Sequence, residues 1–398
     1  MWFKTLNILG KKLNPIVQGG MGVGVSAHRL AGAVARENAV GTIASIDLRH
    51  HHPDLEEQTE HCRDRELIDQ ANLIALDREI KAAKNHAQGH GAVAVNVMKA
   101  VRQHPALVQQ ACESGADLLV MGAGLPLDLP EMVADFPKMG LVPILSESRG
   151  VAIVMKKWLK KGRCPDAIVI EHPGHAGGHL GANKIEDLHA PRFEFGLVLK
   201  ECRALFDELG LGQDAPPIIL AGGIDSHEKV RHWLGAGASA VQLGTAFAVT
   251  HEGDAHNNFK RVLINATPSN LVEFTSVAGL PARAVSTYWL KQYQRHEPRM
   301  QACAKADPRR CAQRMDCLTQ CGLRDGNPRV GQFCIDLKLV AALKGDVQKG
   351  LFFRGAGTLP FGKAVRSVHE LIEYLLYGTF PAGLDFTSTA FLNDQVVA

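Results

Sequence analysis

The sequence predicts a (β/α)8 barrel with an additional, mainly helical C-terminal module, and two observations support this fold class. Short apolar runs rich in Val, Ile, Leu and Ala alternate with longer stretches of helical periodicity. These runs are apolar throughout, as expected of a parallel sheet that is covered on both faces. Eight such units over about 250 residues fit a barrel better than an open sheet, which usually has fewer strands.

Each barrel element follows from its own stretch of sequence. Strands are expected at the apolar runs 14–18, 40–45, 92–97, 117–121, 141–145, 167–170, 217–221 and 240–244. Helices are expected between them and after the last one, at 26–38, 65–88, 105–114, 131–138, 149–160, 193–209, 226–234 and 257–265. Ser26 is expected to cap the first helix.

The pattern changes after Thr275. A basic and aromatic stretch is followed by a cysteine-rich segment, and the chain then has the pattern of a helix, a Gly/Pro-rich loop and a helix. We therefore predict two domains, a barrel over residues 1–265 and an accessory module over residues 266–398 that packs near the barrel mouth.

Composition excludes several classes of partner. The 398 residues carry 44 Lys and Arg against 41 Asp and Glu, a net charge of +3 that does not indicate a nucleic-acid or membrane partner. No apolar run reaches the roughly 18–20 residues of a membrane span, and the N-terminus lacks a convincing signal peptide. We expect a cytoplasmic protein with a small-molecule substrate, and the sequence leaves its oligomeric state open.

Glycine-rich segments follow three of the predicted strands. Gly22, Gly24 and Ala27 satisfy the dinucleotide fingerprint G-x-G-x-x-G/A, with Asp47 as a possible ribose partner, but that fingerprint belongs to an open sheet and the barrel prediction weakens it. The loops Gly222–Ile224 and Gly244–Phe247 follow strands seven and eight, where barrels commonly bind a phosphate. Tight turns without a ligand are the alternative.

The strand-one glycines lie across the predicted mouth from these two loops. Backbone at Gly20, Met21 and Gly22 can approach a flat ring, and Asn96 at the end of strand three can offer its amide to a polar ring edge. Flavin mononucleotide (FMN) meets both needs, because it has one phosphate and one planar heterocycle. The structural alternative for Asn96 is a turn cap.

Histidines are concentrated in two loops. The segment EHPGHAGGHLG, residues 171–181, follows strand six and contains His172, His175 and His179, which suit proton abstraction next to a flavin. Zinc is a weaker alternative, because these histidines lack the helical H-E-x-x-H arrangement. His50–His52 also follow a strand, but a solvated loop is an equal explanation and we assign them no catalytic role.

In combination, the motifs PIVQGGMG, AVNVM, IEHPGHAGGHLG, PIILAGGI and AVQLGTAF resemble the nitronate monooxygenase family, formerly called 2-nitropropane dioxygenases, over roughly residues 13–285. The resemblance implies an FMN-dependent barrel enzyme that oxidises alkyl nitronates with molecular oxygen. Because the same barrel serves enoyl-acyl-carrier-protein reductases and quinone reductases, an NAD(P)H-dependent reductase of enoyl thioesters or quinones is the alternative. A non-catalytic regulator that binds flavin is a second alternative function.

The resemblance also assigns roles to residues. It implies that His179, in the A-G-G-H-x-G motif, is the catalytic base or anion-stabilising acid, with His175 as its rival. It further implies that the flavin contacts Gly20, Met21, Gly22, Asn96, Gly178, Gly181, Gly222, Gly223, Gly244 and Thr245.

Nine cysteines are unevenly placed. Four are scattered over the first half, whereas Cys303, Cys311, Cys317, Cys321 and Cys334 are concentrated in one segment. The odd total and the lack of a secretion signal favour reduced thiols. The spacing C-x7-C-x5-C-x3-C-x12-C matches neither a zinc ribbon nor a common ferredoxin, so we expect no metal. Zinc or an iron–sulfur cluster on the last four cysteines is the alternative.

Overall fold

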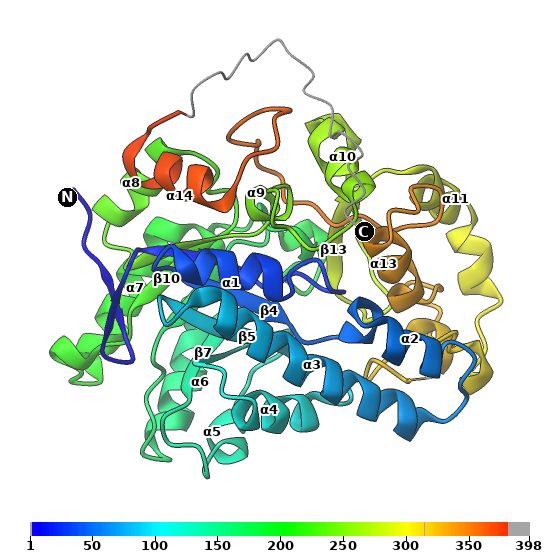
Figure 1. The fold of residues 1–398 in the computed structure, drawn as a ribbon, viewed down its shortest axis with the longest axis horizontal. Helices are drawn as coiled ribbons and strands as arrows, with labels where there is room; N and C mark the ends of the chain where they lie inside the picture. Colours follow the sequence, from blue (N-terminus) through cyan, green and yellow to red (C-terminus); the bar gives the residue numbers. More distant parts are fainter. Residues whose placement is uncertain (1, 314, 381–398) are drawn as a thin grey trace.

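The computed structural model describes residues 2–313 and 315–380, and eight parallel strands form a closed barrel at its centre (Figure 1). The strands are β3 (Ile16–Gln18), β4 (Val40–Ala44), β5 (Ala92–Met98), β6 (Leu118–Gly122), β7 (Gly140–Leu145), β8 (Ile168–Glu171), β10 (Ile218–Ala221) and β11 (Ala240–Leu243). β11 pairs with β3 and closes the ring. All eight predicted strands are confirmed, each to within two residues at either end.

Helices surround the barrel as the sequence predicts, with two corrections. The confirmed helices are α1 (His28–Arg36), α3 (Arg65–Ala87), α4 (His104–Glu113), α6 (Ser148–Leu159), α7 (Phe195–Glu208), α8 (His227–Gly235) and α10 (Asn257–Asn265). The predicted helix at 131–138 is wrong, because only the single turn α5 (Leu129–Met132) forms and Pro137 disfavours helical backbone before it. Ser26 does not cap α1; its hydroxyl accepts the Met21 backbone N–H at 2.9 Å instead.

An N-terminal hairpin that the sequence did not indicate closes one end of the barrel. Strands β1 (Leu6–Ile8) and β2 (Lys11–Leu13) pair antiparallel. Leu6, Ile8 and Leu13 are buried in one cluster with the inward-facing residues of the barrel strands. A second, larger apolar layer lies between the strands and the surrounding helices. The open end of the barrel is therefore the one at the carboxyl ends of the strands.

The C-terminal region contains strands as well as helices. The prediction of a mainly helical module did not include these strands. Strands β12 (Leu271–Thr275) and β13 (Pro281–Val285) join β9 (Gly178–His179) in an antiparallel sheet. The helices are α11 (Tyr288–Ala302), α12 (Gly322–Asp325), α13 (Ile335–Leu343) and α14 (Val368–Tyr377). The remaining short helices are α2 (Pro53–Thr59), α9 (Thr245–Ala248), and the 3-10 helices η1 (Leu48–His51), η2 (Ile185–Asp187), η3 (Pro191–Phe193), η4 (Gly212–Asp214), η5 (Pro268–Asn270) and η6 (Pro308–Arg310).

Helix α14 lies on the barrel wall although it is far from the barrel strands in sequence. It packs against α1 and α8, near the N-terminus (Figure 1). The Trp2 indole N–H donates to the Leu376 carbonyl at 2.7 Å. The division of the chain at residue 266 stays a prediction, and α14 suggests that the barrel wall includes residues on both sides of it.

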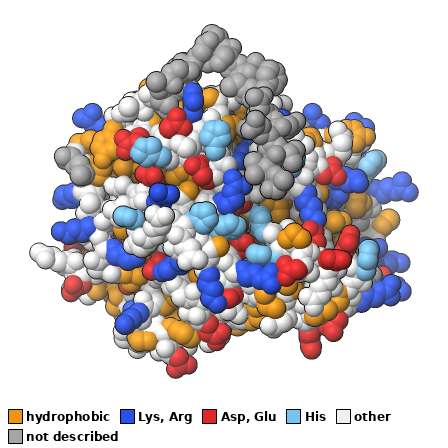
Figure 2. All heavy atoms as spheres, in the orientation of Figure 1, with side chains coloured by type: hydrophobic (Ala, Val, Ile, Leu, Met, Phe, Trp, Pro, Cys, Tyr) orange, Lys and Arg blue, Asp and Glu red, His pale blue; other side chains and the backbone are white. Residues whose placement is uncertain are grey.

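The surface agrees with the balanced charge of the sequence. Basic and acidic side chains are interspersed over the face that Figure 2 shows. Within the described ranges, no helix is both long and apolar enough to cross a membrane.

Candidate active site

A cavity of about 590 Å³ opens at the carboxyl ends of the barrel strands. This volume is in the range of small-molecule and cofactor sites. The structure brings every predicted site residue into its lining, namely Gly20, Met21, Gly22, Asn96, Gly178, His179, Gly181, Gly222, Gly223, Gly244 and Thr245. Their roles toward a ligand stay predictions.

The loops after β10 and β11 form one wall of the cavity. Gly222 and Gly223 have φ of +103° and +72°, backbone that side chains rarely adopt. A Cβ on Gly223 would stand 2.9 Å from the His175 side chain. Gly244 precedes the short helix α9, which begins at Thr245. Bare backbone and a short helix N-terminus after the last two strands are the usual phosphate-binding elements of this fold.

The strand-one loop lies close to the end of β5. A Cβ on Gly20 would collide with the Cβ of Asn96, and one on Gly22 would stand 2.7 Å from Ile46 Cγ2. Glycine is therefore required for this approach, and the backbone of residues 20–22 lies directly at the cavity surface. A flat ring can stack on such a surface without meeting side chains.

His179 lies in β9, which is held by antiparallel pairing with β13 opposite Ala282. Its ring packs against Phe353, with 5.7 Å between the ring centres. Burial lowers the pKa of His179 to about 4. Its Nε2 is buried and has no hydrogen-bond partner among the described residues. At neutral pH this imidazole is therefore uncharged and able to accept a proton.

Arg283 holds the histidine loop in place. Its guanidinium is buried, forms an ion pair with Glu273 at 2.5 Å, and donates to the carbonyl of Pro173 at 3.4 Å and to that of Ala176. The Leu180 N–H donates to Pro281 O at 2.8 Å. These contacts fix the backbone on both sides of His179. No local sequence pattern indicates this role, because Arg283 is about a hundred residues away from the loop.

Two further polar groups in the cavity were not predicted from sequence. Glu171, at the end of β8, lines the cavity, and burial raises the pKa of its carboxyl to about 7. Arg354 is buried near the phosphate-type loops, donating to Leu263 O at 3.1 Å and Gly355 O at 3.0 Å. The Gly355 N–H in turn donates to Thr245 Oγ1 at 3.1 Å. The glycine-rich stretch R-G-A-G-T at 354–358 is the sequence feature that could have indicated a role for Arg354.

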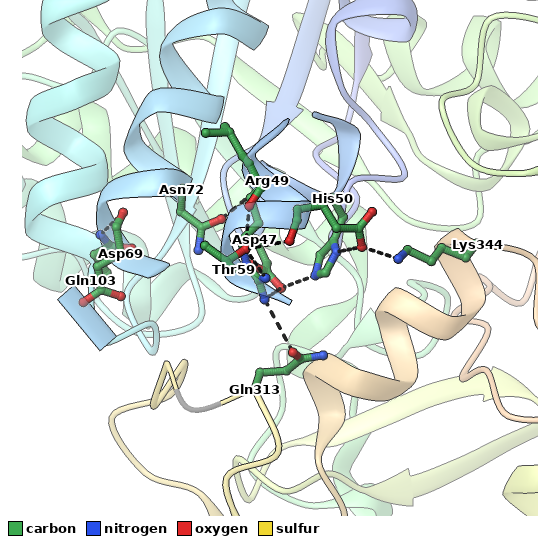
Figure 3. A network of polar contacts seen from close by, with 11 residues as sticks. Asp47, Arg49, His50, Thr59, Asp69, Asn72, Gln103, Gln313 and Lys344 are labelled. Carbon is green, nitrogen blue, oxygen red and sulfur yellow. Dashed lines mark hydrogen bonds and ion pairs between the residues drawn. The ribbon is translucent and has the colours of Figure 1, made fainter. Parts of the chain in front are cut away.

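His50 lies in a buried polar network with Asp47 and Arg49 (Figure 3). His50 contacts Asp47 at 2.9 Å and Glu56 at 2.7 Å, while His51 Nε2 lies 2.8 Å from Gly24 O. The cavity lining, taken over the described residues, includes none of the three histidines. The alternative of a solvated loop is contradicted, because His50 and His51 have the partners named above and His52 Nε2 lies 3.0 Å from Glu79 Oε1.

Asp47 belongs to the same network and is not a ribose ligand. Its carboxylate forms an ion pair with the Arg49 guanidinium at 2.8 Å, and both side chains are buried (Figure 3). Although burial opposes it, the hydrogen bond with His50 and the charge of Arg49 hold the pKa of Asp47 well below its usual value. Gly22 and Gly24 therefore do not form a dinucleotide site with this residue.

The cavity fits a planar cofactor with one phosphate. The glycine surface at residues 20–22 matches the planar ring, and the left-handed glycines after β10 match the phosphate. The unpartnered Nε2 of His179 offers a hydrogen bond to a bound molecule. The fold and this cavity define the class, a (β/α)8-barrel oxidoreductase.

Comparison with known proteins identifies the family. The family model of nitronate monooxygenase matches residues 6–378, so the chain belongs to that family of flavin-dependent oxidoreductases. A relative from Bacillus subtilis, a probable nitronate monooxygenase, is 28% identical over 298 residues, which cover 71% of this chain and 79% of that protein. The predictions of family, fold class and oxidoreductase activity are confirmed.

Solved structures share the fold. FabK from Thermotoga maritima superposes with a TM-score of 0.61 and 20% identity, over 91% of each chain. A nitroalkane oxidase from Streptomyces ansochromogenes gives a TM-score of 0.60 and 20% identity, over 91% of this chain and 95% of that one.

Proposed function

We propose that this chain binds FMN without a covalent bond and oxidises alkyl nitronates with molecular oxygen. The observation that carries the proposal is the position of His179, a neutral histidine with a buried and unpartnered Nε2, in the lining of the same cavity as the glycine surface and the phosphate-type loops. Family membership supports the flavin, and the name of the Bacillus subtilis relative supports the substrate class.

In this proposal the loops after β10 and β11 hold the cofactor phosphate, with Arg354 contributing positive charge nearby. Gly20–Gly22 and Asn96 hold the ring. The bound flavin supplies electron transfer between substrate and oxygen. His179 would accept the α-carbon proton where the parent nitroalkane enters, leaving the nitronate and an imidazolium that stabilises its negative charge; toward a nitronate that enters as such it would provide a hydrogen bond to the oxygens. Glu171, with its pKa near neutrality, can exchange a proton in the same cavity.

A reductase of enoyl thioesters is the second candidate, because part of the cavity is apolar. Leu280, Leu318, Leu339, Leu351 and Phe353 line it beside the histidine loop. Such a surface suits an acyl chain better than a small nitronate. The structural likeness to FabK supports the same barrel for this chemistry but, at 20% identity, not the activity itself.

Anaerobic mixing tests the two functions. Ethylnitronate is expected to bleach the flavin absorbance of the purified holoprotein, and admitted oxygen is expected to restore it with release of nitrite. Bleaching by NADH or NADPH, with no response to the nitronate, would establish the reductase. If neither reduces the flavin, both assignments fail and the binding-only alternative stands. Protein that neither contains FMN nor takes it up on titration contradicts the cofactor assignment.

A further inference from the structure

The loop between β3 and α1 passes beside the three consecutive histidines at residues 50–52. Three of the four residues 22–25 of this loop line the cavity. Of the hydrogen bonds that the described residues make, only one reaches residues 22–25, between His51 Nε2 and the Gly24 carbonyl oxygen at 2.8 Å. A carbonyl oxygen can only accept, so the imidazole carries its proton on Nε2 and donates it. This part of the loop therefore has a single hydrogen-bonded anchor.

Gly24 and the half-buried His51 imidazole are in tight contact. Gly24 has a φ of +59°, a left-handed conformation that glycine adopts without strain. A Cβ at this position would stand 2.5 Å from His51 Nε2 and 3.0 Å from Leu343 Cδ2 on α13. The loop backbone, the imidazole and α13 therefore pack together with no space for a further side chain.

The two neighbouring histidines fix the segment that carries His51. His50 Nε2 lies 2.9 Å from the Asp47 carboxylate, and His52 Nε2 lies 3.0 Å from Glu79 Oε1. Both carboxylates are buried. The chain on each side of His51 is thus held by a buried charged partner, which leaves the imidazole between them in a defined position.

Glu79, on α3, also contacts the beginning of α1. Its Oε2 accepts the backbone N–H of His28 at 2.7 Å and lies 2.8 Å from the Nδ1 of the same residue. Although burial opposes it, the hydrogen bonds with His28 and His52 hold the pKa of Glu79 well below its usual value. The histidine segment therefore contacts the strand-one loop at Gly24 and, through Glu79, the helix that follows this loop.

We propose that His51 is a positioning residue for the flavin ring, because its hydrogen bond to the Gly24 carbonyl holds residues 22–25 in the conformation that forms the cavity surface. His51 is not among the described residues that line the cavity, so it acts through the loop. The inference rests on the proposed flavin cofactor. It gives a role to the motif D-L-R-H-H-H-P-D at residues 47–54, to which the sequence analysis assigned no catalytic function.

Titration of the flavin-free full chain with FMN and with riboflavin tests this role. His51→Phe keeps an aromatic ring but removes the donor. We expect it to raise the dissociation constants of both flavins by about tenfold, because a loop that has lost its anchor must be ordered on binding. The ratio of the FMN and riboflavin affinities should stay at the wild-type value, since the phosphate-type loops are unchanged. The visible absorption spectrum of the bound flavin should differ from that of the wild type.

Two further variants separate positioning from a general loss of structure. His51→Gln, whose side-chain amide can donate to the same carbonyl, should stay within about threefold of the wild-type affinities. His61→Phe makes the aromatic substitution at a histidine whose side chain is 93% exposed, and it should leave both affinities unchanged.

Three results overturn the proposal. They are wild-type affinities in His51→Phe, a His51→Gln variant that binds as weakly as His51→Phe, and a loss confined to FMN, which would locate the effect at the phosphate-type loops. A wild-type chain that takes up neither flavin overturns the proposed cofactor together with this inference.

Gly24→Ala changes the same contact from the loop side and serves where His51→Phe does not fold. Its added Cβ must displace the imidazole, so it should weaken FMN and riboflavin binding alike. Gly89→Ala is the matched control, because Gly89 also has a left-handed φ, of +82°, but has open space around its missing Cβ. Equal flavin affinities in the two glycine variants contradict the proposal.

Discussion

At the scale of single residues, protonation decides what the cavity can do. Burial favours the neutral form of each group, so it lowers the pKa of His179 to about 4 and raises that of Glu171 to about 7. The cavity thus contains a neutral imidazole and a carboxyl group that changes charge near physiological pH. Both protonation states result from burial of the two side chains in the folded protein, and not from neighbouring residues in the sequence.

Replacing His179 with Asn is expected to reduce turnover about 10²–10⁴-fold while the flavin stays bound, because an amide retains hydrogen bonding but cannot relay a proton. Steady-state rates and flavin absorbance of the purified variant measure the two effects. His175→Asn is the matched control, since it changes the neighbouring histidine of the same loop. If His175→Asn were the damaging change and His179→Asn harmless, the base would be misassigned.

Glu171 predicts a pH dependence of stability in the flavin-free protein. Because its folded-state pKa of about 7 lies above the ordinary 4.5, the folded state binds the proton more tightly. The associated stability is complete below about pH 4.5 and is lost as pH rises through 7, by at most about 3 kcal/mol. Glu171→Gln should therefore gain stability relative to wild type between pH 5 and pH 8.

Urea unfolding of both proteins at these two pH values measures the difference. The same pH dependence in wild type and Glu171→Gln would show that another group causes it.

At the scale of elements, close approach of backbone decides where glycine is required. Gly41 in β4 faces α1, and a Cβ there would fall on the carbonyl oxygen of Ala31. Gly196 in α7 has open space around its missing Cβ. The sequence does not distinguish these two glycines. The packing of α1 on the sheet makes glycine necessary at position 41 and not at position 196.

Gly41→Ala is expected to destabilise the chain by about 1–3 kcal/mol, because backbone atoms of α1 must move. Gly196→Ala, its control, should stabilise by about 0.5–1 kcal/mol through helix propensity. Chemical denaturation of both variants checks the signs. A Gly41→Ala protein as stable as wild type would mean that α1 does not pack as described.

At the scale of the whole molecule, segments far apart in sequence complete the barrel and its cavity. The hairpin β1–β2 fills one end, α14 covers the wall between α1 and α8, and Phe353, Arg354 and Gly355 line the cavity at the other end. A ligand in the cavity therefore contacts both the barrel strands and the C-terminal region. Binding should stabilise the chain as a unit.

FMN at about 100 times its dissociation constant should stabilise the flavin-free chain by about 2.7 kcal/mol, because it binds only the folded state. Thermal unfolding should therefore shift to higher temperature with FMN and less with riboflavin, which lacks the phosphate. An equal shift with both ligands would argue against the phosphate loops.

The sequence by itself determined the barrel, because each strand is a local apolar run and each helix has its own period. It also indicated the cavity glycines and His179, since residues that follow successive parallel strands must meet at one end of a barrel. It could not indicate β9, β12 or β13, whose pairing joins His179 to Ala282 across about a hundred residues.

Tertiary structure alone decided how the remaining polar groups are used. It placed Arg283 against the histidine loop, Arg354 near the phosphate-type loops, and His50 in a buried network with Asp47. The physical reason is common to all of them, because burial and partner choice depend on contacts between segments that local sequence patterns do not encode.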